Sequence, residues 1–470
     1  MDSSPIARKH RQPNRSWVRP LSDEGGPRYQ QIAEQIMTAV RDGVLQQGDR
    51  LPPQRQLAQV MGVDLTTVTR PYAEVRLAGL LDAQGAGGTY IASSIREDGV
   101  TVDLSMNIPP LLGSPAFARL MRNGLAHLGD QLGHGDLMNY HIGAGARTDR
   151  EAAALWLEPV LGRIAPDRVL ICAGAQSALA ALLIARSQPG DRIASEGLTY
   201  PGLLACARAL QRSVTPVAAD QQGMLPEDLD RVCQEQQPAL IYLNPTIHNP
   251  TATTMSAQRR QAIHAVASRH RVPIIEDDPY WLLAGDAPAP LATLRGEAPV
   301  FYVSTLSKCL APGLRTAYLV VPPGEPMEPL LDALRAITLM ANPCLVSMAS
   351  SWIRSGQANE MLQKTRQELG QRQKLAARIL PGRPQAHPHG LHLWLDLPPW
   401  SDHDRLIRTA QEQGLGVAIS SAFSASDTAP DAIRLSLGGA TDQATLKMAL
   451  QTLSEILATG SNPPGRAVVV

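Results

Sequence analysis

The sequence predicts an α/β protein of two folded units, a small helical unit followed by a larger unit built on a mainly parallel sheet. Helical periodicity followed by a glycine-rich hairpin occupies residues 27–92, and short apolar runs alternate with Ala/Leu-rich helical stretches beyond residue 104. A chain of 470 residues also exceeds one core of ordinary size. We expect a flexible basic tail at 1–26, a first unit at 27–92, a linker at 93–103, a second unit at 104–458 and a flexible tail at 459–470.

The amino-acid composition limits which kinds of binding partner and which cellular compartment we expect. Lys+Arg and Asp+Glu both number 43, so no strong overall field favours nucleic acid or membranes, and any such partner must meet a local patch. The five cysteines are scattered without a CxxC pair, which argues against a zinc site or a disulfide framework and fits a reducing compartment. No apolar run approaches the roughly 20 residues that span a bilayer, and no signal peptide is recognisable. We therefore expect a cytoplasmic protein without a membrane partner.

The first unit reads as three helices and a hairpin. "PRYQQIAEQIMTAVRDGVL" has apolar residues at a spacing of four and predicts a helix that ends near Gly43. "QRQLAQVMGV" predicts a second short helix closed by Gly62, and Asp64 precedes a third in "LTTVTRPYAEVRLAGLL". "LLDAQGAGGTYIAS" predicts two short strands around a glycine-rich turn. The apolar positions expected in the core are Ile32, Ile36, Val40 and Val44 of the first helix and Leu57, Val60 and Met61 of the second. This order is that of a winged helix-turn-helix.

The first unit resembles the GntR family of bacterial regulators. The matching words are "GDRLPPQRQLA", "GV" followed by "TTV", and "GGTYIAS" at the wing. The resemblance implies a DNA-binding domain whose third helix enters the major groove. By position it implies DNA contacts from Arg55, Thr66 and Thr67, with Arg70 helping at the backbone.

Three residues depart from that family pattern. Leu65 stands where an arginine usually precedes the Thr-Thr pair, and leucine cannot make the bidentate contact to guanine. Pro71 is expected to kink or break the third helix, and Gln84 replaces a basic wing residue. Residues 27–92 hold six arginines, no lysine and six acids, so phosphate contacts could come from the basic tail (Arg8, Lys9, Arg11, Arg15 and Arg19) or that tail could simply be solvated. A protein-binding or vestigial winged helix is the alternative for this unit.

In the second unit, polar groups follow the ends of successive predicted strands. "GAQSALAALLIA" follows "VLIC" directly, so Gly174 to Ser177 fall at a helix N-terminus that suits a phosphate. Asn249 follows "ALIYLNP", while Asp277 and Tyr280 follow "VPII". "STLSKCLAPGLR" follows "PVFYV" and carries Lys308. Because parallel strands end at one edge of a sheet, we expect these groups to form one site.

Together these motifs resemble fold-type I pyridoxal-phosphate (PLP) enzymes, the aspartate aminotransferase superfamily, over residues 104–458. The resemblance implies a large, mainly parallel sheet domain with a smaller C-terminal α+β subdomain. It implies that Lys308 forms the Schiff base with PLP and acts as the catalytic lysine, and that Asp277 binds the pyridine nitrogen. The remaining implied roles are Asn249 and Tyr280 at the phenolic oxygen, Tyr200 on the ring face, Ala175, Gln176, Thr305, Ser307 and Arg315 at the phosphate, Tyr140 at the neighbouring subunit's phosphate, and Arg434 at a substrate or effector carboxylate.

A GntR-like head fused to an aminotransferase-like body is similar to the MocR group of bacterial transcription regulators. That resemblance implies a PLP-responsive regulator that binds operator DNA, forms a homodimer and senses PLP, with an amino acid or amine as a further candidate effector. A working aminotransferase with an accessory head is the alternative from another class, since every residue for transamination is present. A PLP-free scaffold that only brings two heads together is a third.

Overall fold

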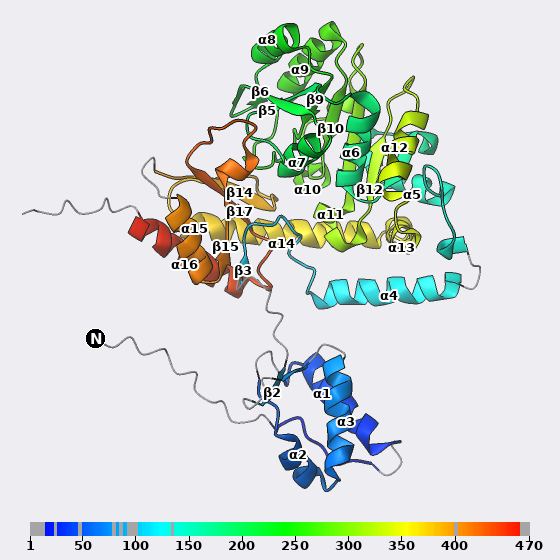
Figure 1. The fold of residues 1–470 in the computed structure, drawn as a ribbon, viewed down its shortest axis with the longest axis vertical. Coiled ribbons are helices and arrows are strands. Elements are labelled where there is room, and N and C mark those ends of the chain that lie inside the picture. Colours follow the sequence, from blue (N-terminus) through cyan, green and yellow to red (C-terminus); the bar gives the residue numbers. More distant parts are fainter. Residues whose placement is uncertain are drawn as a thin grey trace, which may run out of the picture. The chain divides into compact units, whose positions relative to one another are not determined.

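The computed structural model describes residues 15–22, 26–45, 49–77, 81–83, 88–91, 102–132, 136–398 and 403–460. The chain forms two compact units, Met1–Asp98 and Gly99–Val470 (Figure 1). Most of the expected linker, the wing residue Gln84, the first fourteen residues and residues 461–470 lie outside the described ranges.

The first unit has the predicted order of three helices and a hairpin. Its elements are α1 (Arg28–Arg41), α2 (Gln54–Met61), α3 (Leu65–Leu77), β1 (Leu81–Ala83) and β2 (Thr89–Ile91). The two strands pair antiparallel with Leu81 opposite Ile91. Gly62 adopts the left-handed conformation (φ 63°) that ends α2. The winged helix-turn-helix is thereby confirmed.

The core of this unit differs from the predicted stripe at its edges. Ile32, Ile36 and Leu57 are buried as expected. The prediction for Val44 and Val60 is wrong, since these side chains are 43% and 52% exposed. Helix α1 ends at Arg41, so the spacing of four no longer carries to Val44, and the next residue, Leu45, enters the core instead. Val40 and Met61 are only partly buried.

Pro71 does not end the third helix, contrary to expectation. Helix α3 continues through it to Leu77, and Pro71 itself is buried. Val68, Tyr72 and Val75 on the same helix pack into the core, and the Tyr72 hydroxyl donates to the Pro52 carbonyl at 2.7 Å. Packing of this face outweighs the one backbone hydrogen bond that proline removes.

The second unit is organised by a seven-stranded sheet with the order β4-β12-β11-β10-β9-β5-β6. Its strands are β4 (Val169–Cys172), β5 (Arg192–Glu196), β6 (Ser213–Val217), β9 (Leu240–Leu243), β10 (Ile274–Asp277), β11 (Val300–Thr305) and β12 (Ala317–Val320). Only β12 runs antiparallel to its neighbours, β11 and β4, so the sheet is mainly parallel as predicted. A short hairpin, β7 (Ala219–Asp220) and β8 (Gly223–Met224), follows β6.

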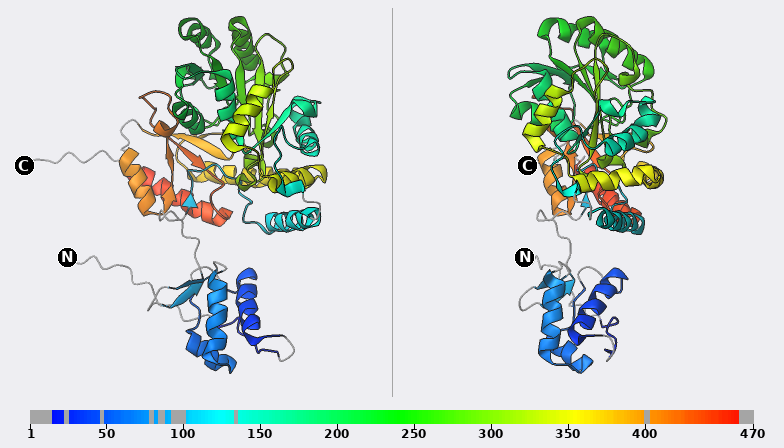
Figure 2. Two further views of the ribbon diagram at one scale, coloured as in Figure 1. Left: turned by 45° about the vertical axis from the view of Figure 1, so that its right-hand side comes forward. Right: turned by 90° about the vertical axis from the view of Figure 1, so that its right-hand side faces the viewer.

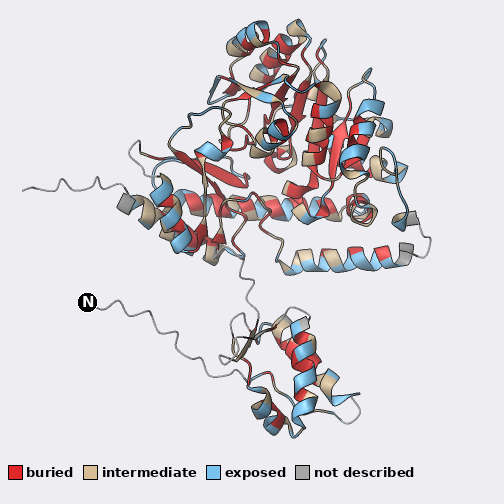
Figure 3. Ribbon diagram, viewed as in Figure 1, coloured by how far each residue is buried: buried red, intermediate tan, exposed pale blue. Residues whose placement is uncertain are grey.

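Helices cover both faces of this sheet (Figure 2). Alternate residues of β4 show why: Val169 and Ile171 join one apolar cluster, whereas Leu170 and Cys172 join another on the opposite face. The second face packs against α6 (Ala175–Arg186), α7 (Pro201–Ala209) and α12 (Glu328–Thr338). The first face packs against α4 (Pro115–Leu132), α5 (Arg147–Leu161), α8 (Pro226–Gln236), α9 (Ala257–His270), α13 (Pro343–Arg354) and the start of α14 (Gln357–Ile379). The strands are accordingly buried on both sides (Figure 3).

A smaller α+β part completes the second unit, as the resemblance implied. Its antiparallel sheet has the order β13-β14-β17-β16, and β15 pairs parallel with β3 from the start of the unit. The elements are β3 (Val102–Asp103), β13 (Gln385–Ala386), β14 (His392–Asp396), α15 (His403–Glu412), β15 (Leu415–Gly416), β16 (Ala418–Ile419), β17 (Ala432–Ser436) and α16 (Gln443–Gly460). Across the described residues, none of the helices combines the length and apolar character that crossing a membrane requires.

Candidate functional site

The site begins at the carboxyl ends of β9 and β10. Asp277 is the last residue of β10 and is 8% exposed. The hydroxyl of Tyr242, on the neighbouring strand, donates to Asp277 Oδ2 at 2.7 Å, and Asn244 Nδ2 donates to the Asp277 carbonyl at 2.6 Å. Burial raises the pKa of Asp277 to about 6, an effect that the Tyr242 hydrogen bond and Lys308 oppose and the Asp278 charge reinforces. This carboxylate is therefore poorly solvated and lies ready to pair with a buried cationic N–H.

Lys308 lies in a four-residue helix, α11 (Leu306–Cys309), directly after β11. Its Nζ donates to the main-chain carbonyl of Asn107 at 2.7 Å. Burial, together with the charges of Arg434 and Arg315, lowers the pKa of Lys308 to about 8 against the attraction of Asp277. About a tenth of the amine is therefore neutral at pH 7, and the neutral amine is the nucleophile that condenses with an aldehyde.

An anion cradle lies where α6 follows β4. Helix α6 begins at Ala175, so the amide groups of Ala175 and Gln176 belong to a first turn without intrahelical acceptors. Gly174 has φ 90°, and a Cβ there would lie 2.3 Å from Arg315 Nη2, so only glycine lets the guanidinium approach this turn. Arg315 Nη2 donates to the Ala173 carbonyl at 3.3 Å. The cradle thus combines helix-end amides with a fixed positive charge.

Two hydroxyls and one aromatic ring adjoin the cradle. Thr305 caps α11, and its Oγ1 lies 3.0 Å from Ser307 Oγ. The Tyr200 hydroxyl donates to Gln176 Oε1 at 3.3 Å, and Gln176 Nε2 donates to the Gly202 carbonyl at 2.8 Å. A Cβ at Gly202 would lie 2.3 Å from the Tyr200 ring, so this glycine lets the ring lie close to the chain.

Arg434 reaches the site from β17 in the smaller part of the unit. Its Nη1 donates to Asn249 Oδ1 at 2.7 Å, its Nη2 donates to the Ser105 carbonyl, and its guanidinium lies 4.8 Å from the centre of the Phe423 ring. Arg434 Nε is buried with no hydrogen-bond partner among the described residues. Burial lowers the pKa of Arg434 to about 10. A carboxylate would satisfy this buried cation.

Sequence reasoning missed three residues of this site: Asn107, Tyr242 and His392. Asn107 Nδ2 lies 3.2 Å from Tyr280 Oη and 2.9 Å from His392 Nδ1. Asn107 stands in a loop ("SMNIPP") after the two-residue strand β3, which lies within the expected linker and was not predicted as a strand, and His392 begins β14 far away in sequence. One signal in the sequence could have indicated Tyr242. It lies two residues before Asn244 in the predicted strand "ALIYLNP", and residues two apart in a strand point to the same face of the sheet.

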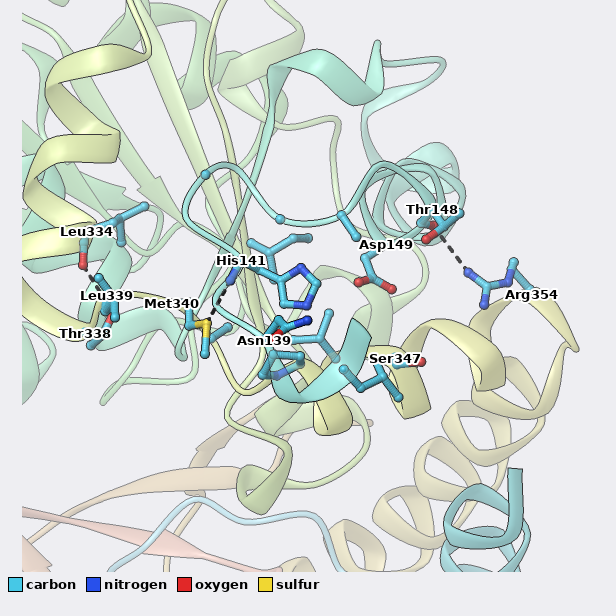
Figure 4. A pocket seen from close by; sticks show the side chains of 18 residues that line it. Asn139, His141, Thr148, Asp149, Leu334, Thr338, Leu339, Met340, Ser347 and Arg354 are labelled. Atoms are coloured by element: carbon cyan, nitrogen blue, oxygen red, sulfur yellow. Dashed lines mark hydrogen bonds between the residues drawn. The ribbon is translucent and has the colours of Figure 1, made fainter. Parts of the chain in front are cut away.

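Tyr140 is not among the residues gathered at the site in the single chain. It is 74% exposed and follows the short helix η2 (Asp136–Met138). Its neighbours Asn139 and His141 line a separate cavity of about 510 Å³, together with parts of α5, α12 and α13 (Figure 4). None of the side chains around Lys308 lines that cavity.

In the first unit, Arg55 on α2 and Thr66 on the first turn of α3 are exposed, and Thr67 is partly buried. Leu65, the first residue of α3, is 41% exposed. Arg70 is engaged within the unit, because its Nε donates to Glu74 at 3.0 Å and its guanidinium lies 3.8 Å from the centre of the Tyr29 ring.

Comparisons with known proteins match both units. The family model described as aminotransferase class I and II matches residues 100–453, and the model of bacterial regulatory proteins of the gntR family matches residues 28–91. The uncharacterized HTH-type transcriptional regulator YdeF of Bacillus subtilis is 28% identical over 94% of this chain and 97% of its own length. The vitamin B6 salvage pathway transcriptional repressor PtsJ of Salmonella typhimurium is 30% identical over 79% and 86%. Among solved structures, the α-aminoadipate aminotransferase LysN of Thermus thermophilus, complexed with N-(5'-phosphopyridoxyl)-L-leucine, has a TM-score of 0.68 at 25% identity and covers 83% of this chain and 98% of that one.

Proposed function

Because this chain belongs to the aminotransferase class I and II family and carries a gntR-family head, the combination of the MocR group, we propose that it is a DNA-binding transcription regulator whose operator affinity responds to PLP. One observation carries the proposal: a helix-turn-helix head and an aminotransferase-like unit that brings Lys308 and Asp277 to one edge of its sheet occur in the same chain. The vitamin B6 salvage pathway repressor among the relatives, which matches 79% of this chain, supports PLP as a sensed ligand.

Pyridoxal phosphate is the cofactor of this unit, and the described residues fit it. The cofactor supplies an electron-withdrawing pyridinium ring and an aldehyde. We propose that Lys308 binds the aldehyde carbon, that Asp277 pairs with the pyridine nitrogen, and that Asn249 and Tyr280 donate to the phenolic oxygen. Two observations support this arrangement. Asp277 is a buried carboxylate, and Gly174 lets the Arg315 guanidinium approach the start of α6. Neither charge has an oppositely charged side chain in hydrogen-bond contact among the described residues.

The other roles extend the same arrangement. Tyr200 would lie against the ring face, and Arg434, with its unpartnered Nε, would take the carboxylate of an amino-acid effector. The phosphate would lie among the groups at the cradle, namely Ala175, Gln176, Thr305, Ser307 and Arg315.

For the head, we propose that Thr66 and Thr67 reach base edges from the first turn of α3, with Arg55 on α2 alongside. Arg70 would contribute at the phosphate backbone through the nitrogens that its Glu74 contact leaves. The exposed first turn of α3 supports this orientation. The proposed domain limits remain 27–92 for the head and 104–458 for the PLP-binding body.

We further propose a homodimer formed through the face around the 510 Å³ cavity. Five large apolar side chains in the segments that form the cavity are exposed, namely Met138, Tyr140, Ile142, Ile337 and Leu339, and Leu339 itself lines the cavity. Before α5, Met138, Tyr140 and Ile142 alternate along the chain with Asn139 and His141, which line the cavity (Figure 4). A second copy would cover this rim and bring Tyr140 to its partner's phosphate. Leu339→Arg should yield monomers in light scattering, whereas Leu125→Arg, at an exposed site on α4, should leave the dimer intact.

The binding of PLP and the binding of DNA would be thermodynamically linked. If PLP favours one dimer geometry and so changes the affinity for DNA by some factor, DNA must change the affinity for PLP by the same factor. An electrophoretic shift assay on the DNA upstream of the gene, with and without PLP, tests the proposal. We expect sequence-dependent binding whose affinity changes with PLP. Binding that is absent, or that disappears against nonspecific competitor DNA in both conditions, would contradict it.

An active aminotransferase is the second candidate, and the lowered pKa of Lys308 supports it because the neutral amine is also the general base of proton transfer. Mixing the loaded protein with amino acids and 2-oxoacids while following cofactor absorbance separates the two. Rapid multiple turnover would favour the enzyme, and slow or absent turnover the regulator.

A further inference from the structure

The hydrogen bonds of His392 have a fixed direction. Its Nε2 lies 3.0 Å from the main-chain carbonyl oxygen of His248, and a carbonyl only accepts, so Nε2 carries the hydrogen. His392 is fully buried, and burial together with the charge of Arg434 lowers its pKa to about 3. The ring is therefore neutral, and Nδ1 is an acceptor.

That direction determines the orientation of Asn107. Nδ1 of His392 accepts from the amide nitrogen of Asn107 at 2.9 Å, and the opposite amide orientation would set two acceptors against each other. The same Nδ2 donates to Tyr280 Oη at 3.2 Å. Asn107 Oδ1 is left buried without a partner in the described part of the chain.

Tyr280 consequently keeps its own hydrogen. Its oxygen accepts from Asn107, the residue is 1% exposed, and no described residue accepts from its hydroxyl. A buried donor without an acceptor is costly, so the site is completed only when a ligand atom accepts from it. The main-chain carbonyl of Asn107 meanwhile accepts from Lys308 Nζ at 2.7 Å, so one residue holds both groups.

We propose that Asn107, oriented by neutral His392, is a positioning residue that keeps the Tyr280 hydroxyl a donor toward the phenolic oxygen of PLP at Lys308. The inference rests on the proposed placement of PLP and does not depend on DNA binding. Among the described residues, the charged and titratable groups that face Tyr280 are Asp277, Arg434, Tyr200 and Tyr242, with the His392 ring centre 5.7 Å from its own. His392 and Asn107 are both neutral, so they orient the Tyr280 hydroxyl through hydrogen bonds and add no charge beside it.

The test replaces His392 with leucine in the full chain loaded with PLP. Without the ring, the Asn107 amide can turn and its Oδ1 can accept the Tyr280 hydrogen. Loss of that donor from the phenolic oxygen disfavours its anionic form, so the pH midpoint of the cofactor's absorbance change should rise by about one pH unit, a tenfold change in proton affinity. His392→Gln, whose Oε1 can again accept from Asn107, should return the midpoint toward that of the unaltered protein.

Two backgrounds distinguish this role from a general disturbance. In Asn107→Ala and in Tyr280→Phe, His392→Leu should leave the midpoint unchanged, because the turning amide or the hydroxyl is gone. The proposal would be overturned if His392→Leu raised the pH midpoint equally in all backgrounds, or if it did not raise the midpoint in the otherwise unaltered protein. Either result would leave the proposed binding of PLP and DNA unaffected. If His392→Leu is too unstable to measure, Asn107→Asp is the substitute variant. A carboxylate can only accept, so the side chain at position 107 would then accept the Tyr280 hydrogen instead of donating to Tyr280. Introducing Asn107→Asp into the Tyr280→Phe background as well measures the effect of the added charge alone.

Discussion

The carboxylate at the centre of the site should reduce the stability of the cofactor-free protein. Asp277 has its pKa raised to about 6 from an ordinary value of 3.8, chiefly by burial. The folded state therefore binds a proton more tightly than the unfolded chain does. The stability associated with that proton is fully present below about pH 4 and is lost as the pH rises through about 6.

The size of the effect follows from the pKa difference. About two pKa units at 1.36 kcal/mol each give a cost of about 3 kcal/mol at pH 8, as an upper value. Asp277→Asn removes the charge while its Oδ1 can still accept from Tyr242. Cofactor-free Asp277→Asn should therefore be more stable than the unaltered protein in urea denaturation at pH 8, by up to about 3 kcal/mol. The difference should shrink toward pH 5.

Addition of PLP should reverse the order, because the pyridinium N–H then pairs with the carboxylate and the asparagine loses that charge pair. Asp286→Asn, at a side chain 86% exposed, is the matched control and should change little in either condition. If cofactor-free Asp277→Asn were less stable than the unaltered protein at pH 8, burial of this charge would not be the cost that we infer.

Three further changes test the division of labour between the units. Lys308→Ala should abolish the Schiff-base absorbance of the bound cofactor and leave PLP-independent DNA affinity within about twofold in fluorescence anisotropy. Loss of cooperative melting would instead reveal a folding defect. Arg55→Ala should weaken operator binding about tenfold and reduce its salt dependence, with an unchanged cofactor spectrum, so an altered spectrum would contradict the assignment. Gly174→Ala should weaken PLP binding at least tenfold, because the new Cβ would displace Arg315 from the cradle and the φ of 90° disfavours alanine. Gly162→Ala is the control for backbone strain, since Gly162 also has a positive φ but has open space around it. Equal losses of PLP affinity in the two variants would refute the role of Arg315.

Local pattern was sufficient for the architecture. The order of helices and hairpin in the head, and the alternation of apolar runs with helices in the body, follow from periodicity within short windows, and the structure confirms both. The structure also places Asp277 and Lys308 at one edge of the sheet, because parallel strands end on the same side. Predictions from the sequence pattern were wrong at the ends of helices, where Val44 and Val60 are exposed instead of buried. They were also wrong at Pro71, where packing of Tyr72 and Val75 keeps α3 continuous.

The sequence by itself determined which residues follow which strands, and hence the kind of chemistry that this protein can perform. Only the tertiary structure decided that Tyr242 donates to Asp277, that Arg434 crosses from the smaller part to Asn249, and that His392 orients Asn107. These pairs lie 35, 185 and 285 residues apart. No local window contains both members of such a pair, and the direction of each hydrogen bond depends on a partner that folding alone brings into contact.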